Sequence, residues 1–240
     1  MPLSFKSFII IFLAIFIVPV FGQENNELKK LISETNNYYG ANDLIYLGEL
    51  YQPSNPFAKG TPFFTDRYLP AKVSIKNNVF ENITTKYNIE TDQLLLVAKT
   101  ELGEIILITL KENWVDNFIL DHHYFVNISK SQPTLNIKGY YELVFSGKKN
   151  LFIKYSNSFI NTYSQLTPNG FYSKTKRRIY LSDHNNFIFI KNKKHFLNLY
   201  AKNKNEIKKY MRKNKIKFSN ASSNQLNNLM QYCDGLSDTM

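Results

Sequence analysis

The sequence is poor in cysteine and glycine: its 240 residues include one Cys and nine Gly. The single thiol, Cys233, cannot form a disulfide within the chain. The glycines are scattered and form no phosphate-binding loop, and no Gly-x-Ser-x-Gly motif marks a serine nucleophile. These absences exclude disulfide-rich small domains, P-loop nucleotidases and hydrolases with that serine motif.

Acidic residues are also scarce, because 19 Asp and Glu stand against 30 Lys and Arg, for a net charge of +11. Residues 191–217 hold eleven Lys or Arg and one acid, Glu206, so this segment alone carries +10. Such a block predicts either a solvated helical face or a surface that binds an anion. The candidate anion-binding residues are Lys204, Lys208, Lys209, Arg212, Lys213 and Lys215.

Long apolar runs are missing except at the start, where one extends from Phe8 to Phe21. It follows Lys6 and ends near Gly22, which is typical of a secretory signal peptide over residues 1–22. A membrane anchor is the alternative, but the run is short for a span of about 20 residues. We therefore expect cleavage near Gly22 and a periplasmic, secreted or outer-surface protein.

Export limits the partners of the basic segment. An exported protein meets anionic lipid head groups, acidic polymers and other envelope proteins, and it meets little nucleic acid. We expect a partner from the first three classes and no nucleic acid. The sequence indicates no cofactor and leaves the oligomeric state open.

Three segments in a row predict neighbouring β-strands. Ala71–Lys76 alternates apolar and polar residues, Asn77–Asn78 suits a hairpin turn, and the strand Val79–Ile89 is expected to point Val79 and Ile83 to one face. Gln93–Lys99 and Ile105–Lys111 then lose the alternation. A strand that is apolar on both faces is buried on both, so we expect these two runs to be the central pair of the sheet, with a buried helix as the alternative.

The other strands are expected from the same patterns. Segment 52–70 carries four prolines and predicts an ordered, irregular loop packed by Phe57, Phe63, Phe64 and Tyr68. Further strands and two hairpins are expected over Asp43–Tyr51, Trp114–Leu120, Tyr124–Ile128, Gly139–Ser146 with Leu151–Tyr155, and Arg177–Leu181 with Phe187–Lys191.

Helical spacing is weak over Asn26–Thr35 and clear from Lys193 onward. We expect Asn205 to cap one helix, and Ser222 or Ser223 to cap the last one, which should stop at Gly235. The apolar face of this last helix is expected to comprise Leu226, Leu229, Met230 and Cys233.

Together these elements predict the α+β class: an antiparallel β-meander sheet, open or rolled into a barrel or sandwich, followed by a small C-terminal helical segment. The expected organisation is a signal peptide over residues 1–22, a β-rich domain over 23–191 and a basic helical segment over 192–240.

Chemistry-bearing residues gather only around Asp116–His123, with Glu142 as a further acid. Two adjacent histidines on a strand point to opposite faces, so a shared metal is not expected. Cys233 lies on the expected apolar helix face, which predicts packing rather than reactivity. A hydrolase using the acids and histidines of this stretch is the alternative to a non-enzymatic protein.

Several motifs resemble a group of exported proteins from Bacteroidota bacteria that has no assigned activity. The motifs are Gly60–Phe64, Asn82–Asp92 with Leu95–Val97, Gly139–Leu143 and Glu206–Phe218. The resemblance implies a location in the Gram-negative envelope or outside the cell, and it carries over no catalytic or binding residues. We therefore expect an exported, non-enzymatic binding or scaffold protein of the cell envelope.

Overall fold

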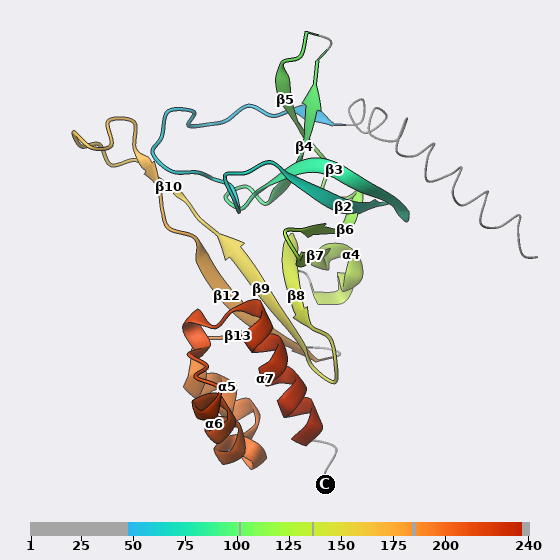
Figure 1. Cartoon of the computed structure of the whole chain (residues 1–240), viewed down its shortest axis with the longest axis vertical. Helices are drawn as coiled ribbons and strands as arrows, with labels where there is room; N and C mark the ends of the chain where they lie inside the picture. Colours follow the sequence, from blue (N-terminus) through green and yellow to red (C-terminus); the bar gives the residue numbers. More distant parts are fainter. Residues whose placement is uncertain (1–47, 101, 136, 184–185, 237–240) are drawn as a thin grey trace, which may run out of the picture. The chain divides into compact units, whose positions relative to one another are not determined.

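The computed structural model describes residues 48–100, 102–135, 137–183 and 186–236, which fall within one compact unit of the chain (Figure 1). The expected signal peptide, the expected helix at 26–35 and most of the expected strand at 43–51 lie outside the described residues. Those expectations stay predictions.

The described residues form one antiparallel sheet of eleven strands in the order β1-β5-β4-β3-β2-β6-β7-β8-β9-β12-β13. A second sheet pairs β10 with β11. The strands are β1 (Glu49–Leu50), β2 (Leu69–Ile75), β3 (Asn78–Asn88), β4 (Gln93–Lys99), β5 (Ile105–Thr109), β6 (Val115–Leu120), β7 (His123–Asn127), β8 (Tyr140–Phe145), β9 (Asn150–Ser156), β10 (Phe159–Ile160), β11 (Phe171–Tyr172), β12 (Lys176–Asp183) and β13 (Asn186–Ile190).

Three helices follow the last strand: α5 (Lys193–Leu199), α6 (Lys204–Lys213) and α7 (Ser223–Leu236). A short helix, α4 (Ile128–Ser131), interrupts the strands, and 3-10 turns lie at Pro133–Leu135, Ala201–Asn203 and Phe218–Asn220. The α+β class, with the sheet first and the helices last, is therefore confirmed. Among the described residues the outermost strands β1 and β13 do not pair with each other, so the sheet stays open.

The expected strands β4 and β5 are present, but their expected place at the centre of the sheet is wrong. β5 pairs with the two-residue strand β1 at one end of the sheet. The chain then returns across the sheet, so that β6 pairs with β2 and Ala71 lies opposite Leu120. β2, β6 and β7 therefore occupy the middle of the strand order.

The hairpin between β2 and β3 turns one residue earlier than expected. Lys76 and Asn77 have φ of 48° and 69°, which suits a two-residue turn with both central residues in the left-handed region. Asn82 also has a positive φ, 57°, where the register between the two strands shifts. This bulge changes the parity of β3, so Val79 is exposed and does not share the inward face of Ile83.

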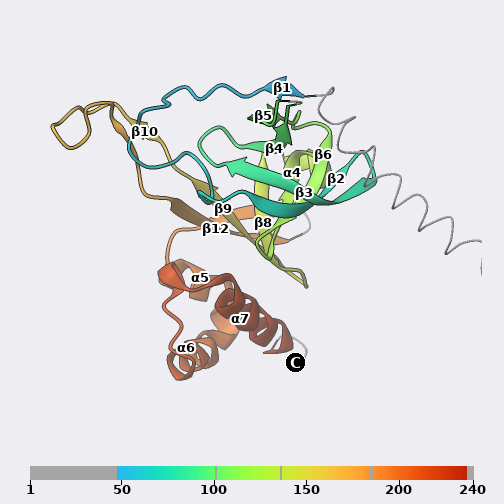
Figure 2. The ribbon, with the colours of Figure 1, turned by 45° about the horizontal axis from the view of Figure 1, so that its top comes forward.

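The main core joins inward-facing residues of strands β2 to β13 to the buried residues of the C-terminal helices, which gather beside β8, β9 and β12 (Figures 1 and 2). α7 packs against β8 and buries Leu226, Leu229, Met230 and Cys233, the apolar face that the spacing predicted. A smaller cluster around Ile128, Tyr141 and Phe152 forms a second core.

The helix ends differ in part from the sequence expectation. Ser222 accepts a hydrogen bond from the Gln225 backbone N–H at 3.2 Å, so this predicted cap is confirmed. α6 begins two residues earlier than expected, after Asn203, and α7 continues past Gly235 to Leu236. No helix in the described part of the chain has the length and apolar character needed to cross a membrane.

Candidate anion-binding surface

Helix α6 separates apolar from basic side chains. Ile207 and Met211, four residues apart, are buried in the main core. The opposite side presents a group that we call the basic helix face, formed by the exposed side chains of Lys208, Lys209, Arg212 and Lys213. Among the described residues these four side chains make no ion pair. Their charges are therefore available to an outside anion.

The two other predicted residues lie close to this face in the chain. Lys204 is half-buried and its Nζ donates to the Asn198 side-chain oxygen at 2.9 Å, so it serves the packing of α5 against α6. Lys215 is exposed and has a positive φ of 52° in the turn after α6. Five of the six predicted residues are therefore solvent-accessible on one continuous piece of chain.

A cavity of about 580 Å³ opens where this turn meets β12 and β13. Its apolar lining comprises Ile179, Phe189, Ile190, Ile216 and Phe218, and its basic lining comprises Arg177, Lys191, Lys193 and Lys217. We call it the basic cavity. Phe189 is 41 % exposed although it is large and apolar. The cavity therefore combines an apolar lining with four cationic side chains.

Arg177 is the most firmly held of these cations. Its Nη1 donates to the Ala221 carbonyl oxygen at 2.9 Å, which ties β12 to the start of α7. Its Nε is buried and has no hydrogen-bond partner among the described residues. The guanidinium lies 6.0 Å from the Tyr155 ring centre.

The sequence reasoning did not select the cations of the basic cavity. Lys191, Lys193 and Lys217 entered only the charge count of the segment, and Arg177 was assigned to a strand. Arg177 does carry a signal, because it shares strand parity with the buried residues Ile179 and Leu181. A cation on the same side of a strand as buried apolar residues indicates a position where charge and apolar surface meet.

The residues of the alternative hydrolase site do not converge, because each contacts a different partner. Asp116 forms an ion pair with Lys130 and accepts the Asn77 backbone N–H at 3.1 Å. Burial alone would raise its pKa, but these hydrogen bonds prevail and lower it. An acid held ionised in this way does not suit a proton donor.

Asp121 and His122 do meet at a cavity, of about 430 Å³, which Glu81 and Lys72 also line. Lys72 pairs with Glu81 at 2.7 Å, and Arg67 pairs with Asp121 at 3.5 Å. Both carboxylates are exposed and already have a cationic partner.

His123 turns away from that cavity to Glu142, whose carboxylate lies 2.7 Å from its Nδ1. The hydrogen bond to Glu142 raises the pKa of His123, although burial opposes it. In the described part of the chain, no three His, Cys, Asp or Glu side chains gather as a metal site would require. Cys233 is buried, as expected from its helix face.

Comparison of the chain with known protein families, curated proteins and solved structures found no match.

Proposed function

We propose that this chain is an exported, non-enzymatic binding protein of the bacterial cell envelope, and that its C-terminal helical segment binds anionic lipid. The observation that carries the proposal is the basic cavity together with the basic helix face, which are close in sequence. Four cations surround apolar side chains there, and four more lie on the outer side of α6.

The apolar lining favours a lipid over a purely hydrophilic acidic polymer. A head group carrying negative charge pairs with Lys and Arg, and an acyl chain replaces water around Phe189 and Ile216. Basic residues near an anionic membrane surface contribute about 1 kcal/mol each. We also propose that the protein is exported and that it is related to the exported Bacteroidota proteins that its motifs resemble.

The test is flotation with vesicles of phosphatidylglycerol or phosphatidylcholine. We expect binding to the first lipid only, weakened by salt. The variant K208Q/K209Q/R212Q/K213Q should bind at least about 100-fold more weakly, because four charges at about 1 kcal/mol each are removed. The control K59Q/K99Q/K138Q/K174Q removes four exposed lysines elsewhere and should keep its affinity.

Equal binding by both variants, or equal binding to both lipids, would refute the lipid proposal. Retention on heparin without binding to anionic vesicles would replace the lipid by an acidic polymer.

An envelope hydrolase is the second candidate, supported by the cavity that brings Asp121 and His122 together with Glu81. It ranks second because both carboxylates are already paired with cations. The assay is turnover of p-nitrophenyl esters, phosphates and glycosides. Activity that is lost in both E81Q and D121N would support it, and no turnover of any of these substrates would remove it.

A further inference from the structure

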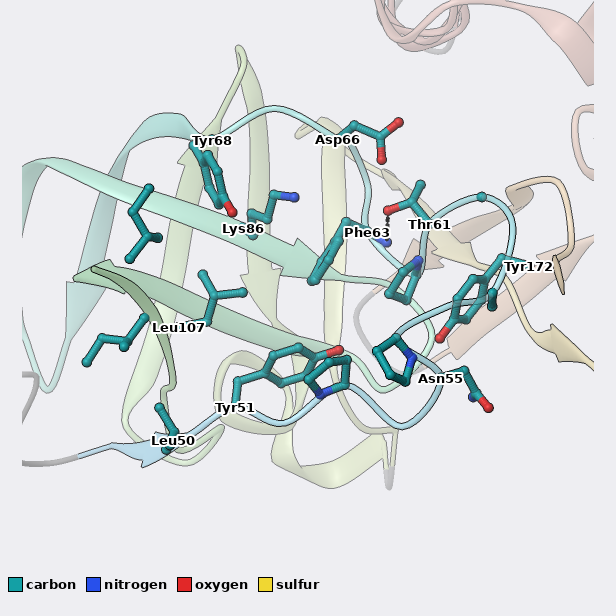
Figure 3. Close-up of a pocket in the computed structure, with 17 residues that line it drawn as sticks. Leu50, Tyr51, Asn55, Thr61, Phe63, Asp66, Tyr68, Lys86, Leu107 and Tyr172 are labelled. Atoms are coloured by element: carbon teal, nitrogen blue, oxygen red, sulfur yellow. Dashed lines mark hydrogen bonds between the residues drawn. The ribbon is translucent and has the colours of Figure 1, made fainter. Parts of the chain in front are cut away.

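A third cavity, of about 460 Å³, lies between the segment 52–68 and strands β3 and β5 (Figure 3). It occupies the face of β3 opposite to Tyr87, because Lys86 lines it and neighbouring strand residues point to opposite faces. Its volume lies in the range of small-molecule sites. None of the basic helix face or basic cavity residues lines it.

The walls of this cavity are fixed by hydrogen bonds at several points of segment 52–68. The Ile89 backbone N–H donates to the Pro62 carbonyl oxygen at 2.9 Å, and the Phe64 N–H donates to the Tyr87 carbonyl oxygen at 2.8 Å. The Asn157 side chain donates to the Thr61 carbonyl oxygen at 2.7 Å. These hydrogen bonds fix segment 52–68 against β3 and the segment that follows β9.

A hydrogen bond also positions Tyr51, one of the lining residues. Asn88, which is 1 % exposed, donates from its side chain to the Tyr51 hydroxyl at 3.2 Å. The side-chain oxygen of Asn88 accepts two backbone N–H groups of the following turn, Glu90 and Thr91. The amide is thus fixed in orientation, and it fixes the Tyr51 ring in turn.

Lys86 is the unusual member of the lining. It is only 8 % exposed, and its Nζ lies 4.4 Å from the Phe63 ring centre and 4.6 Å from the Tyr68 ring centre. Figure 3 shows the side chain extending between these two rings. Within the described residues the ammonium makes no hydrogen bond or ion pair.

Such an ammonium has no lone-pair acceptor among the described side chains. Aromatic faces stabilise a cation, but they accept none of its three N–H groups through lone pairs. Burial lowers the pKa of Lys86, which reports the cost of holding the charge there, while the carboxylate of Asp66 opposes that effect. Asp66 is exposed at the rim of the cavity.

The rest of the lining is largely apolar or aromatic. Leu50, Ile106 and Leu107 come from β1 and β5, Tyr51 directly follows β1, and Phe63 comes from the covering segment 52–68. We propose that this cavity binds a small organic monoanion, a carboxylate with an apolar or aromatic body, and that Lys86 anchors its carboxylate. A second negative charge is disfavoured because the lining offers one cation, and Asp66 repels anions at the rim.

The test is calorimetry of the full chain with benzoate and hexanoate, each compared with its neutral amide. We expect both carboxylates to saturate one site and the amides to bind at least about tenfold more weakly, the usual effect of losing a charge-assisted hydrogen bond. K86M should weaken the carboxylates by the same factor, whereas K86R should retain most of the affinity. The matched control K99M removes an exposed lysine outside the cavity and should bind like the unaltered protein.

A second measurement does not depend on K86M being folded. In the unaltered protein, lysines are reductively methylated with ¹³C-formaldehyde and observed by NMR. The chemical shift of the Lys86 methyl groups should change with benzoate but not with benzamide. The proposal is overturned if neither carboxylate binds with a Kd below about 10 mM, if the amides bind as well, or if folded K86M binds benzoate unchanged. Vesicle binding should be the same in K86M, which separates this site from the lipid surface.

Discussion

The Glu142 carboxylate, 3 % exposed, accepts a hydrogen bond from His123 Nδ1 at 2.7 Å and another from the Tyr155 hydroxyl at 2.6 Å. These residues lie on β8, β7 and β9, and Ser223 at the start of α7 adds a further hydrogen bond. The buried charge therefore links three neighbouring strands to the basic helical segment.

Stability should depend on pH through this cluster. Burial alone would raise the pKa of Glu142, but its hydrogen bonds lower it, so its contribution is present above the unfolded value near 4.5 and is lost in acid. The pKa of His123 is raised, so its contribution is full below the unfolded value near 6.5 and declines as pH rises through the folded value. We expect maximal stability between these limits, measured by urea unfolding from pH 3 to 9.

Two variants separate this effect from other titrations. H123Q should flatten the decline above pH 6.5, and E142Q should unfold about 2 kcal/mol more easily near pH 6 because His123 loses its charged partner. An unchanged pH profile in H123Q would show that another group causes the decline.

A partly buried ion pair, Asp92 with Lys154, predicts that one carboxylate has a clear effect on stability. The Asp92 carboxylate accepts hydrogen bonds from Lys154 Nζ at 2.5 Å and from the Tyr87 hydroxyl at 2.5 Å. Burial lowers the pKa of Lys154. D92N leaves that ammonium without its counter-charge, so the free energy of unfolding should fall by about 2 kcal/mol. Thermal or urea unfolding measures the loss.

The matched control is E104Q, which neutralises an exposed acid. It should change stability by less than about 0.5 kcal/mol. If D92N and E104Q unfold alike, the Asp92–Lys154 pair does not stabilise the fold.

Cys233 should be protected from thiol reagents. It is 1 % exposed, and burial raises its pKa to about 12, so few thiolates exist at neutral pH. We expect 5,5′-dithiobis(2-nitrobenzoic acid) to label it only after unfolding. The variant N228C/C233A, with an exposed thiol on the same helix, should react at once, and equally fast reaction of native Cys233 would contradict the packing described here.

Local sequence patterns predicted where strands and helices lie better than they predicted which strands pair. The alternation in β2 and the capping Ser222 depend on nearby residues, and both were recognised. The pairing of β2 with β6 depends on a return across the sheet that no local pattern encodes, so β4 and β5 were wrongly placed at the centre. Phe57, expected to pack the 52–70 loop, is 80 % exposed, whereas Phe64 packs among aromatic rings of the core.

The candidate sites show the same limit. The residues of the basic helix face were selected from the charge count of residues 191–217, together with Lys204 and Lys215. The covering segment 52–68 buries Lys86, which shares its strand parity with Thr84 and Asn88 and not with the apolar Ile83 and Tyr87. Burial of a lysine by a distant loop has no signature in the flanking sequence.

The most direct test of the lipid proposal places a reporter in the basic cavity. The sequence has one tryptophan, Trp114, so W114F/F189W carries a single fluorophore at the exposed Phe189 position. Phosphatidylglycerol vesicles should shift its emission to shorter wavelength and shield it from iodide, while phosphatidylcholine vesicles should do neither. Unchanged emission with phosphatidylglycerol would contradict binding of anionic lipid at this surface.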